Sequence, residues 1–217
     1  MTVTIPPVTV TVKRVTIGLV LRKANLRERK KAATMRHTQL VAVRLFAERG
    51  FDAVSIEQVA AAADVSPSTI YRYFGTKEGL VLHDEHDDGI FAMVPKLLHE
   101  QDLLSAFLVG LDQIGTAHLR DPETVRLRTA LWFSTPSVRA AGYLLADDIV
   151  DALVDDVLAS PRNDLSRSQA RTVIGALIGG LFASMRSWIE DGGTDDIRAR
   201  MSTDLGAIAQ ALHLNRT

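Results

Sequence analysis

The apolar residues of this chain recur at helical spacing almost throughout from Asn25 onward, and no strand-like alternation repeats. Apolar side chains three and four positions apart indicate amphipathic helices, whereas alternation at every second position would indicate strands. Gly, Pro and Ser signals separate the helical segments. The pattern therefore predicts an all-α protein with helices over residues 27–49, 56–63, 67–74, 77–93, 101–119, 122–133, 136–160, 166–190 and 195–213.

Several helix ends are marked by residues with a known conformational preference. Gly50 and the Gly192-Gly193 pair follow apolar runs, where glycine commonly ends a helix. Thr76 and Ser166 are expected to cap the helices that follow them. Pro95 is expected to end or kink the helix that begins near residue 77.

Residues 1–24 differ from the rest of the chain, because they are rich in Thr and Val and contain no acidic residue. No partner strand is predicted elsewhere, so a disordered arm is favoured over a strand. A misassigned start of the chain is the remaining alternative. The expected division is therefore an arm over 1–24, a first domain over 25–80 and a second domain over 81–217.

Composition excludes several classes of protein. The 217 residues contain no Cys, which excludes a disulfide scaffold, a thiolate zinc site and a cysteine nucleophile. The longest apolar run, 173–185, is shorter than the roughly 18–20 residues of a membrane span. The first residues lack the order of a signal peptide, since prolines and basic residues interrupt them. A cytoplasmic protein without membrane contact is expected.

The net charge of −1 conceals a strong asymmetry along the chain. Residues 1–82 contain 13 basic and 6 acidic residues, a net charge of +7, and residues 83–217 contain 12 basic and 20 acidic residues, a net charge of −8. A basic front on an acidic body indicates that the front binds a polyanion.

The segment 55–77, SIEQVAAAADVSPSTIYRYFGTK, contains two short helices joined by a three-residue turn at 63–65. Ser55 and Gln58 have the spacing of a capping box. Ser66 is placed to cap the second helix, with Pro67 in its first position. Two short helices joined in this way form a helix-turn-helix.

The second of these helices has one buried and one exposed face. Ile70 and Phe74 lie four residues apart and are expected to be buried against the two preceding helices. The exposed set consists of small hydroxyls, one arginine and phenols: Ser68, Thr69, Tyr71, Arg72 and Tyr73. Small residues let a helix enter a major groove, arginine can bind a guanine edge, and hydroxyls bind phosphates or bases. Lys77 is expected to bind a phosphate at the start of the next helix.

The stretch from Leu26 to Val81 resembles the N-terminal domain of TetR-family repressors. The resemblance rests on LFAERGFD, on VS-x-x-T-I-Y-x-Y-F and on TKEGL, in the order and spacing of that family. It implies that DNA contacts come from Ser55, Ser66, Ser68, Thr69, Arg72, Tyr73 and Lys77. The basic segment Arg27 to Lys31, with Arg29, Lys30 and Lys31, resembles the positive lead-in that reaches DNA in this family.

Two residues depart from the family pattern. Asp64 occupies the turn position where glycine is usual, and Asp can adopt the left-handed conformation there. Gly79 stands where a helix-forming residue is usual, and it is expected to loosen the joint between the two domains.

The second domain has no comparable motif, and the resemblance implies a helical ligand-binding and dimerisation domain. Its large side chains can line an apolar pocket for a small-molecule inducer. The candidates are Phe91, Phe107, Trp132, Phe133, Tyr143, Phe182 and Met185. No catalytic motif, no metal site and no cofactor site is predicted, because no nucleophile elbow or phosphate loop is present.

A homodimer is expected, because one recognition helix reads too few base pairs for specific binding to an operator. The predicted helices 166–190 and 195–213 are expected to pair with their mates as a four-helix bundle. The first carries Gly175, Ala176, Gly179, Gly180 and Ala183, and the second carries a stripe of Ile197, Met201, Leu205, Ile208 and Leu212.

These features predict a repressor that binds a pseudo-palindromic double-stranded DNA operator as a homodimer and is released by a small, apolar ligand. The alternative is a helical small-molecule-binding protein or enzyme whose front domain mediates assembly. An assembly face should be apolar, whereas the exposed face of the second short helix carries Ser68, Thr69 and Arg72.

Overall fold

The computed structural model describes residues 26–83, 87–118 and 121–213. The residues described form helices and no strands. The helices are α1 (Leu26–Arg49), α2 (Ile56–Ala62), α3 (Pro67–Phe74), α4 (Gly79–Leu82), α5 (Asp87–Glu100), α6 (Leu103–His118), α7 (Pro122–Ser134), α8 (Pro136–Ala159), α9 (Arg167–Glu190) and α10 (Ile197–His213). The all-α prediction is confirmed, and the expected arm lies outside the described residues.

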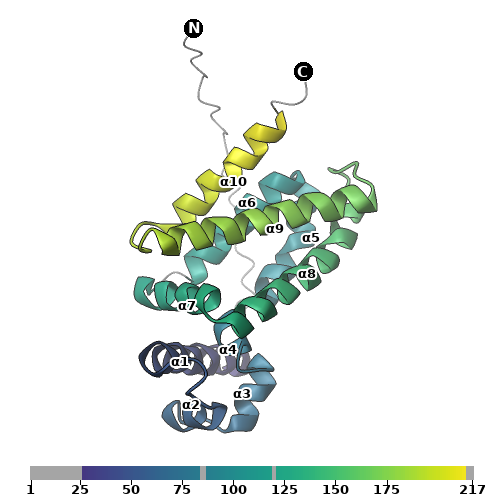
Figure 1. Cartoon of the computed structure of the whole chain (residues 1–217). Coiled ribbons are helices and arrows are strands. Elements are labelled where there is room, and N and C mark those ends of the chain that lie inside the picture. The colour runs from purple at the N-terminus through teal and green to yellow at the C-terminus, as the bar shows by residue number, and fades with distance from the viewer. Residues whose placement is uncertain (1–25, 84–86, 119–120, 214–217) are drawn as a thin grey trace.

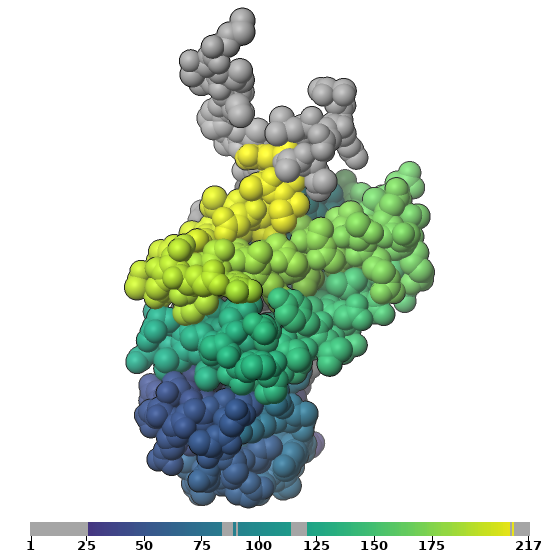
Figure 2. All heavy atoms as spheres, viewed as in Figure 1, coloured from purple at the N-terminus to yellow at the C-terminus, as the bar shows by residue number. Residues whose placement is uncertain are grey.

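The helices are stacked in layers (Figure 1). The helices α1, α2 and α3 form one end of the molecule, and α4 leads from this end into the body. Next to them lie α7 and the first part of α8, followed by α9 and α10, with α5 and α6 on the far side of the view. The space-filling view shows the same order along the molecule (Figure 2). The front domain is therefore an end cap that leaves the outer sides of α2 and α3 uncovered.

The turns of the front domain follow the sequence signals closely. Ser55 caps α2 in a reciprocal capping box with Gln58, and the Ser66 hydroxyl accepts the Thr69 N–H, 3.2 Å away. Asp64 has a φ of +53°, so the aspartate occupies the left-handed conformation that the turn requires. The prediction of a helix-turn-helix with these boundaries is confirmed.

The prediction of one helix over residues 77–93 is wrong. The chain forms α4, then leaves helical geometry at His83, whose ψ is 155°, and forms α5 afterwards. Side chains from other helices bond the carbonyls at the end of α4, which lets the helix stop there. Pro95 lies inside α5, which continues to Glu100.

The boundary expected after residue 80 falls inside α4. The two expected domains also share a cluster of buried residues. The first apolar cluster contains the inner faces of α1 to α4 together with Leu131 of α7 and Val138 of α8. A second cluster joins α5, α6, α8, α9 and α10, and a third surrounds Trp188, Ile197 and Met201. The front domain is thus packed directly on α7 and α8.

The apolar stripe of α10 is buried inside its own subunit, which contradicts its expected place in a dimer interface. Ile197, Met201 and Leu205 are 6%, 8% and 0% exposed. Gly180 of α9 permits this packing, because a Cβ there would lie 2.5 Å from Ile208 Cδ1. The stripe therefore serves the α9–α10 contact, and the Leu212 side chain lies outside the described residues.

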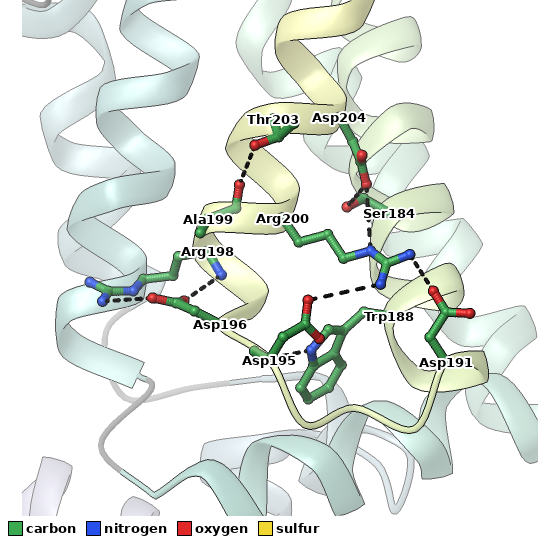
Figure 3. Close-up of polar contacts among 10 residues, drawn as sticks. All are labelled: Ser184, Trp188, Asp191, Asp195, Asp196, Arg198, Ala199, Arg200, Thr203 and Asp204. Carbon is green, nitrogen blue, oxygen red and sulfur yellow. Dashed lines mark hydrogen bonds and ion pairs between the residues drawn. The ribbon is translucent and has the colours of Figure 1, made fainter.

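The turn between α9 and α10 is held by an arginine among carboxylates (Figure 3). Arg200 donates to Asp191 at 2.5 Å and lies 3.9 Å from carboxylate oxygens of Asp195 and Asp204. The indole N–H of Trp188 donates to the Asp195 carbonyl at 3.0 Å. Hydrogen bonding and the nearby carboxylates raise the pKa of Arg200, so the residue remains charged and the turn is pinned.

The helix α9 is long and apolar enough to cross a membrane by length and composition, with 33% of its most apolar window buried. A core helix of a globular protein passes the same test, so this observation is weak evidence for a span. The exposed part of α9 includes Ala176, Gly179 and Ala183, and a Cβ at Gly179 would meet no atom within 4 Å. The apolar character of α9 thus includes an uncovered face of small residues.

Candidate nucleic-acid interface

The helix α3 is fixed by two buried side chains. Ile70 is fully buried and Phe74 is 2% exposed, and both belong to the first apolar cluster with residues of α1 and α2. Gly75 follows with a φ of +72°, and its N–H donates to the Tyr71 carbonyl at 2.9 Å. This packing confirms the predicted buried face and turns the opposite side of α3 outward.

The first turn of α3 presents a group of hydroxyls. The Ser66 Oγ lies 2.8 Å from Ser68 Oγ and 2.9 Å from Thr69 Oγ1. Ser66 and Ser68 are exposed and Thr69 is half-buried. In a helix-turn-helix the N-terminal residues of the second helix contact base edges. These hydroxyls therefore occupy the positions suited to reading bases.

The last turn of α3 has a different surrounding. The Arg72 guanidinium carbon lies 4.8 Å from the centroid of the Tyr73 ring. Both side chains line an open groove between α3 and the start of α1, together with Leu26, Arg27, Glu28, Lys30, Lys31 and Thr34. The α1 residues 27, 30, 31 and 34 share one helix face, so the groove brings together four cations from two helices.

The remaining predicted residues of the front domain lie apart from this groove. Arg29 is exposed on α1 outside the groove lining, and Tyr71 is 51% exposed on α3. Ser55 is exposed and caps α2. The Lys77 ammonium lies 4.4 Å from the ring centroid of Phe51 and 5.7 Å from that of Phe46. Lys77 therefore also stabilises the front domain through its contact with these aromatic rings.

The candidate ligand residues of the second domain are only partly brought together. Trp132 contacts Phe133 and Phe182, with ring centroids 6.0 and 5.1 Å apart, and Phe182 contacts Tyr143 at 5.7 Å. Phe107 packs against the second apolar cluster and Met185 against the third, whereas Phe91 is 41% exposed on α5. Four of the seven residues thus form one aromatic group between α7, α8 and α9.

Two residues with several long-range hydrogen bonds were not identified from the sequence. Gln39 of α1 is 6% exposed, and Arg128 of α7 donates to carbonyls at the end of α4. The sequence around both residues is that of ordinary amphipathic helix. Only the fold brings them to α4, so no local signal was available.

Comparison with known proteins gives a family-model match for part of the front domain. Residues 40–83 match the family model for bacterial regulatory proteins of the tetR family. The chain is 22% identical over 170 residues to a candidate transcriptional regulator of mycofactocin biosynthesis, MftR, from Mycobacterium tuberculosis, covering 75% of this chain and 83% of that protein.

The fold of most of the chain also resembles that of a solved repressor. NalD, the secondary repressor of the MexAB-OprM multidrug efflux pump in Pseudomonas aeruginosa, aligns with a TM-score of 0.51 at 20% identity, over 84% of this chain and 96% of that one. At this identity the likeness concerns the fold. The helix-turn-helix and its exposed hydroxyl face agree with the matching family model, so the N-terminal domain is similar to that of the tetR family of bacterial regulatory proteins.

Proposed function

We propose that the chain is a homodimeric repressor that binds a pseudo-palindromic operator and is released by a small, mostly apolar ligand. The observation that carries this proposal is the uncovered outer face of α3 beside a groove lined by four cations. Proteins similar to this chain are regulators, and we propose that it has no enzymatic activity. We expect it to act in the cytoplasm.

The arrangement of α3 and α1 divides the DNA contacts into two kinds. Ser66, Ser68 and Thr69 at the start of α3 enter the major groove and contact base edges. Arg72 stacks on Tyr73 in the last turn and faces the cations of α1. This position favours a phosphate contact for Arg72 over the guanine contact that its exposed place on the helix first indicated. The groove follows the DNA backbone beside the half-site.

The second copy is proposed to pack against the outer faces of α9 and α10. These faces consist of small residues: Ala176, Gly179 and Ala183 on α9, and Ala199, Thr203, Gly206 and Ala207 on α10. A Cβ at Gly175, Gly179 or Gly206 would meet no atom of its own subunit within 4 Å. Small side chains let helix backbones approach closely, so these faces suit a four-helix contact. This interface uses the two predicted helices with a different face of α10.

The ligand is proposed to bind beside the aromatic group of Trp132, Phe133, Tyr143 and Phe182. These residues come from three helices, and α7 among them also contacts the front domain. A ligand that separates α7 from α8 or α9 therefore acts on the element that positions the front domain. Such a ligand releases DNA only if it binds the released arrangement more tightly than the bound one.

A binding experiment on selected DNA tests this function. The full chain is used to select duplexes from a random pool, and affinity is measured between 50 and 200 mM salt. Replacing Lys30 and Lys31 together by Gln should weaken all duplexes alike and reduce the salt slope by about two units, because each lost phosphate contact removes about 0.9 unit. Ser68→Ala should change the order of preferred sequences instead.

The matched control is Lys96→Gln, on the exposed surface of α5. It removes one positive charge from the second domain and should leave the slope unchanged. Failure of the wild type to select any duplex would contradict the proposed function. An unchanged slope in the double Lys30, Lys31 variant would remove the groove from the DNA interface. If the front domain served assembly instead, neither the reduced salt slope nor the changed sequence preference would be expected.

A further inference from the structure

The C-terminal end of α4 is bonded by two side chains from different domains. Within α4, the Leu80 carbonyl accepts from Gln39 Nε2 at 3.1 Å, and the carbonyl of its last residue, Leu82, accepts from Arg128 Nη2 at 2.9 Å. Arg128 Nε donates to the Val81 carbonyl, and the His83 carbonyl accepts from both residues, at 2.5 Å and 3.3 Å. Gln39 belongs to α1 in the front domain, whereas Arg128 belongs to α7 in the second domain.

This arrangement satisfies groups that a helix end leaves without intrahelical partners. Four consecutive carbonyls, from Leu80 to His83, receive side-chain donors. A guanidinium is suited to the site, because it offers several N–H groups in a fixed plane and its charge opposes the negative end of the helix dipole. Arg128 Nη1 also donates to Gln39 Oε1 at 3.5 Å. The two residues thus act on the same carbonyls and on each other.

The position of α4 fixes the position of α3. A Cβ at Gly79 would lie 1.9 Å from the Phe74 carbonyl oxygen, so α4 begins directly against the end of α3. The Gly79 N–H donates to the Thr76 hydroxyl at 3.1 Å, and Leu80 and Val81 are fully buried. Little freedom remains between the two helices. Gly79, which was expected to loosen the joint between the two domains, permits this close contact between α3 and α4.

The helix α7, which carries Arg128, also contacts the turn between α9 and α10. Val125 of α7 packs against the cluster of Trp188, Ile197 and Met201, and the Arg126 side chain would be 3.0 Å from a Cβ at Gly193. That turn is pinned by Arg200 (Figure 3). The helix α7 therefore runs from a fixed turn beside the proposed dimer faces to the end of α4.

We propose that Gln39 and Arg128 form a clamp on the C-terminal carbonyls of α4 that holds the recognition helix in register with the second domain and so sets the half-site spacing that the dimer accepts. The inference rests on the proposed operator-binding dimer. Gln39 and Arg128 are positioning residues, and neither contacts DNA.

The test compares Arg128→Lys with wild type. Lysine keeps the charge but has a single ammonium, which cannot reproduce the planar set of guanidinium donors. Gln39→Met is the second variant, since it keeps an unbranched side chain of similar length and removes the amide. The matched control is Arg139→Lys, an exposed arginine at the start of α8.

Each protein is titrated with the duplex that the wild type selects and with duplexes that carry one base pair more or fewer at the centre. One base pair changes the separation of half-sites by about 3.4 Å and their relative rotation by about 35°. The preference of the wild type for its own spacing should fall on the order of tenfold in Arg128→Lys, equivalent to about 1.4 kcal/mol. Affinity for an isolated half-site should remain within about twofold, well under that 1.4 kcal/mol.

A second measurement follows the front domains without DNA. The chain contains no Cys, so Ala61→Cys on the exposed side of α2 gives one spin label per protomer. The distribution of distances between the two labels in the dimer should be broader in Arg128→Lys and Gln39→Met than in wild type or Arg139→Lys.

The outcomes separate the clamp from the proposed function. A wild type that selects no duplex contradicts the operator-binding function, and the spacing part of the proposal falls with it. A wild type that selects a duplex, with an Arg128→Lys variant that keeps both the spacing preference and the narrow label distribution, overturns the clamp alone. Equal loss on full sites and half-sites, together with a lower melting temperature, shows a purely structural role and also overturns it.

Discussion

The front domain and the second domain bury apolar surface in similar ways but expose opposite kinds of surface. The front domain covers Ile70 and Phe74 and turns hydroxyls, phenols and arginine outward. The second domain covers the apolar stripe of α10 and turns alanines and glycines of α9 and α10 outward. The net charge of +7 over residues 1–82 suits the front for a polyanion, and the small outward residues of α9 and α10 form the face proposed for a second copy.

This difference also separates local from distant determinants of function. The residues proposed to read DNA lie within one short segment of the front domain, 66–73, and are oriented by caps and turns inside that segment. The aromatic group and the clamp each combine helices far apart in the sequence, whereas the proposed dimer faces lie on two consecutive helices, α9 and α10. Substitutions in the front domain should therefore affect the contact of the substituted residue itself. Substitutions in the second domain should act by altering how its helices pack.

The largest effect is expected from a charge in the buried stripe of α10. Leu205→Asp places a carboxylate at a fully buried position in the contact with α9, and an uncompensated buried charge costs several kcal/mol. We expect this variant to lose cooperative unfolding and to accumulate as insoluble protein. Circular dichroism and recovery of soluble protein measure this outcome.

The exposed counterpart should behave differently. Ala183→Asp lies on the uncovered face of α9 and should leave a folded chain that sediments as a monomer with weakened operator binding. Ala140→Asp, exposed on α8, is the control and should remain a dimer. A folded, dimeric Ala183→Asp protein would remove this face from the interface, and a folded Leu205→Asp monomer would restore the buried stripe to it.

The elements of the front domain follow from its sequence because each carries its own signals. Gly50, Ser55, Asp64, Ser66 and Gly75 mark ends and turns that the structure contains at those residues. The outer face of α3 follows from the spacing of Ile70 and Phe74. What the sequence does not contain is the direction of the Arg72 side chain, since its stacking on Tyr73 and its place beside α1 depend on how α1 crosses α3.

The helices of the second domain follow from the sequence, but the sequence does not determine which helix faces are buried in the subunit. The segments from Leu103 onward form helices close to their expected ranges, since Pro122, Pro136 and Ser166 mark their starts. The apolar stripe of α10 is equally consistent with a core contact and with an interface, and helical periodicity cannot distinguish them. The break after α4 depends on Gln39 and Arg128, which lie 41 residues before Leu80 and 46 residues after Leu82.

The next largest effects are expected from adding a methyl group at one close-packed glycine in each region. Gly79→Ala places a Cβ 1.9 Å from a backbone oxygen, which cannot move without shifting α3 or α4. Gly142→Ala places a Cβ 2.4 Å from Trp132 Nε1, a side-chain atom that can turn aside. Overpacking typically costs about 1–3 kcal/mol, so we expect Gly142→Ala within that range and Gly79→Ala at or above its upper end.

Thermal unfolding and operator titration together distinguish the two glycines. Gly79→Ala should weaken DNA binding more than its loss of stability explains, because it displaces the recognition helix. Gly142→Ala should mainly lower the melting temperature. Gly89→Ala, at a position where a Cβ meets no atom within 4 Å, is the control. Equal effects of Gly79→Ala and Gly142→Ala on both measurements would contradict the separation of local and distant determinants.

The smallest effect is expected from acid, through the residues that cap helices in the two regions. The front domain uses the hydroxyls of Ser55 and Ser66, which do not titrate in this range. Asp102 directly precedes α6 and caps it: its carboxylate accepts the Ser105 N–H at 3.0 Å and the Ser105 hydroxyl at 2.7 Å. Burial raises the pKa of Asp102, but these and other hydrogen bonds together lower the pKa by more than burial raises it, so the net pKa lies below its ordinary value.

A carboxylate with a depressed pKa stabilises the folded protein at pH values above its unfolded pKa, and this contribution is lost as the pH falls through the folded value. The loss begins below about pH 4, the ordinary pKa of aspartate. Asp102→Asn keeps a cap acceptor, so its melting temperature should be close to that of wild type at pH 7 and should fall less steeply between about pH 4 and pH 3. Ser166→Asn, which exchanges a cap that does not titrate, should leave the acid slope of the wild type unchanged. Identical acid slopes for wild type and Asp102→Asn would show that acid sensitivity arises elsewhere and that the caps do not distinguish the two regions.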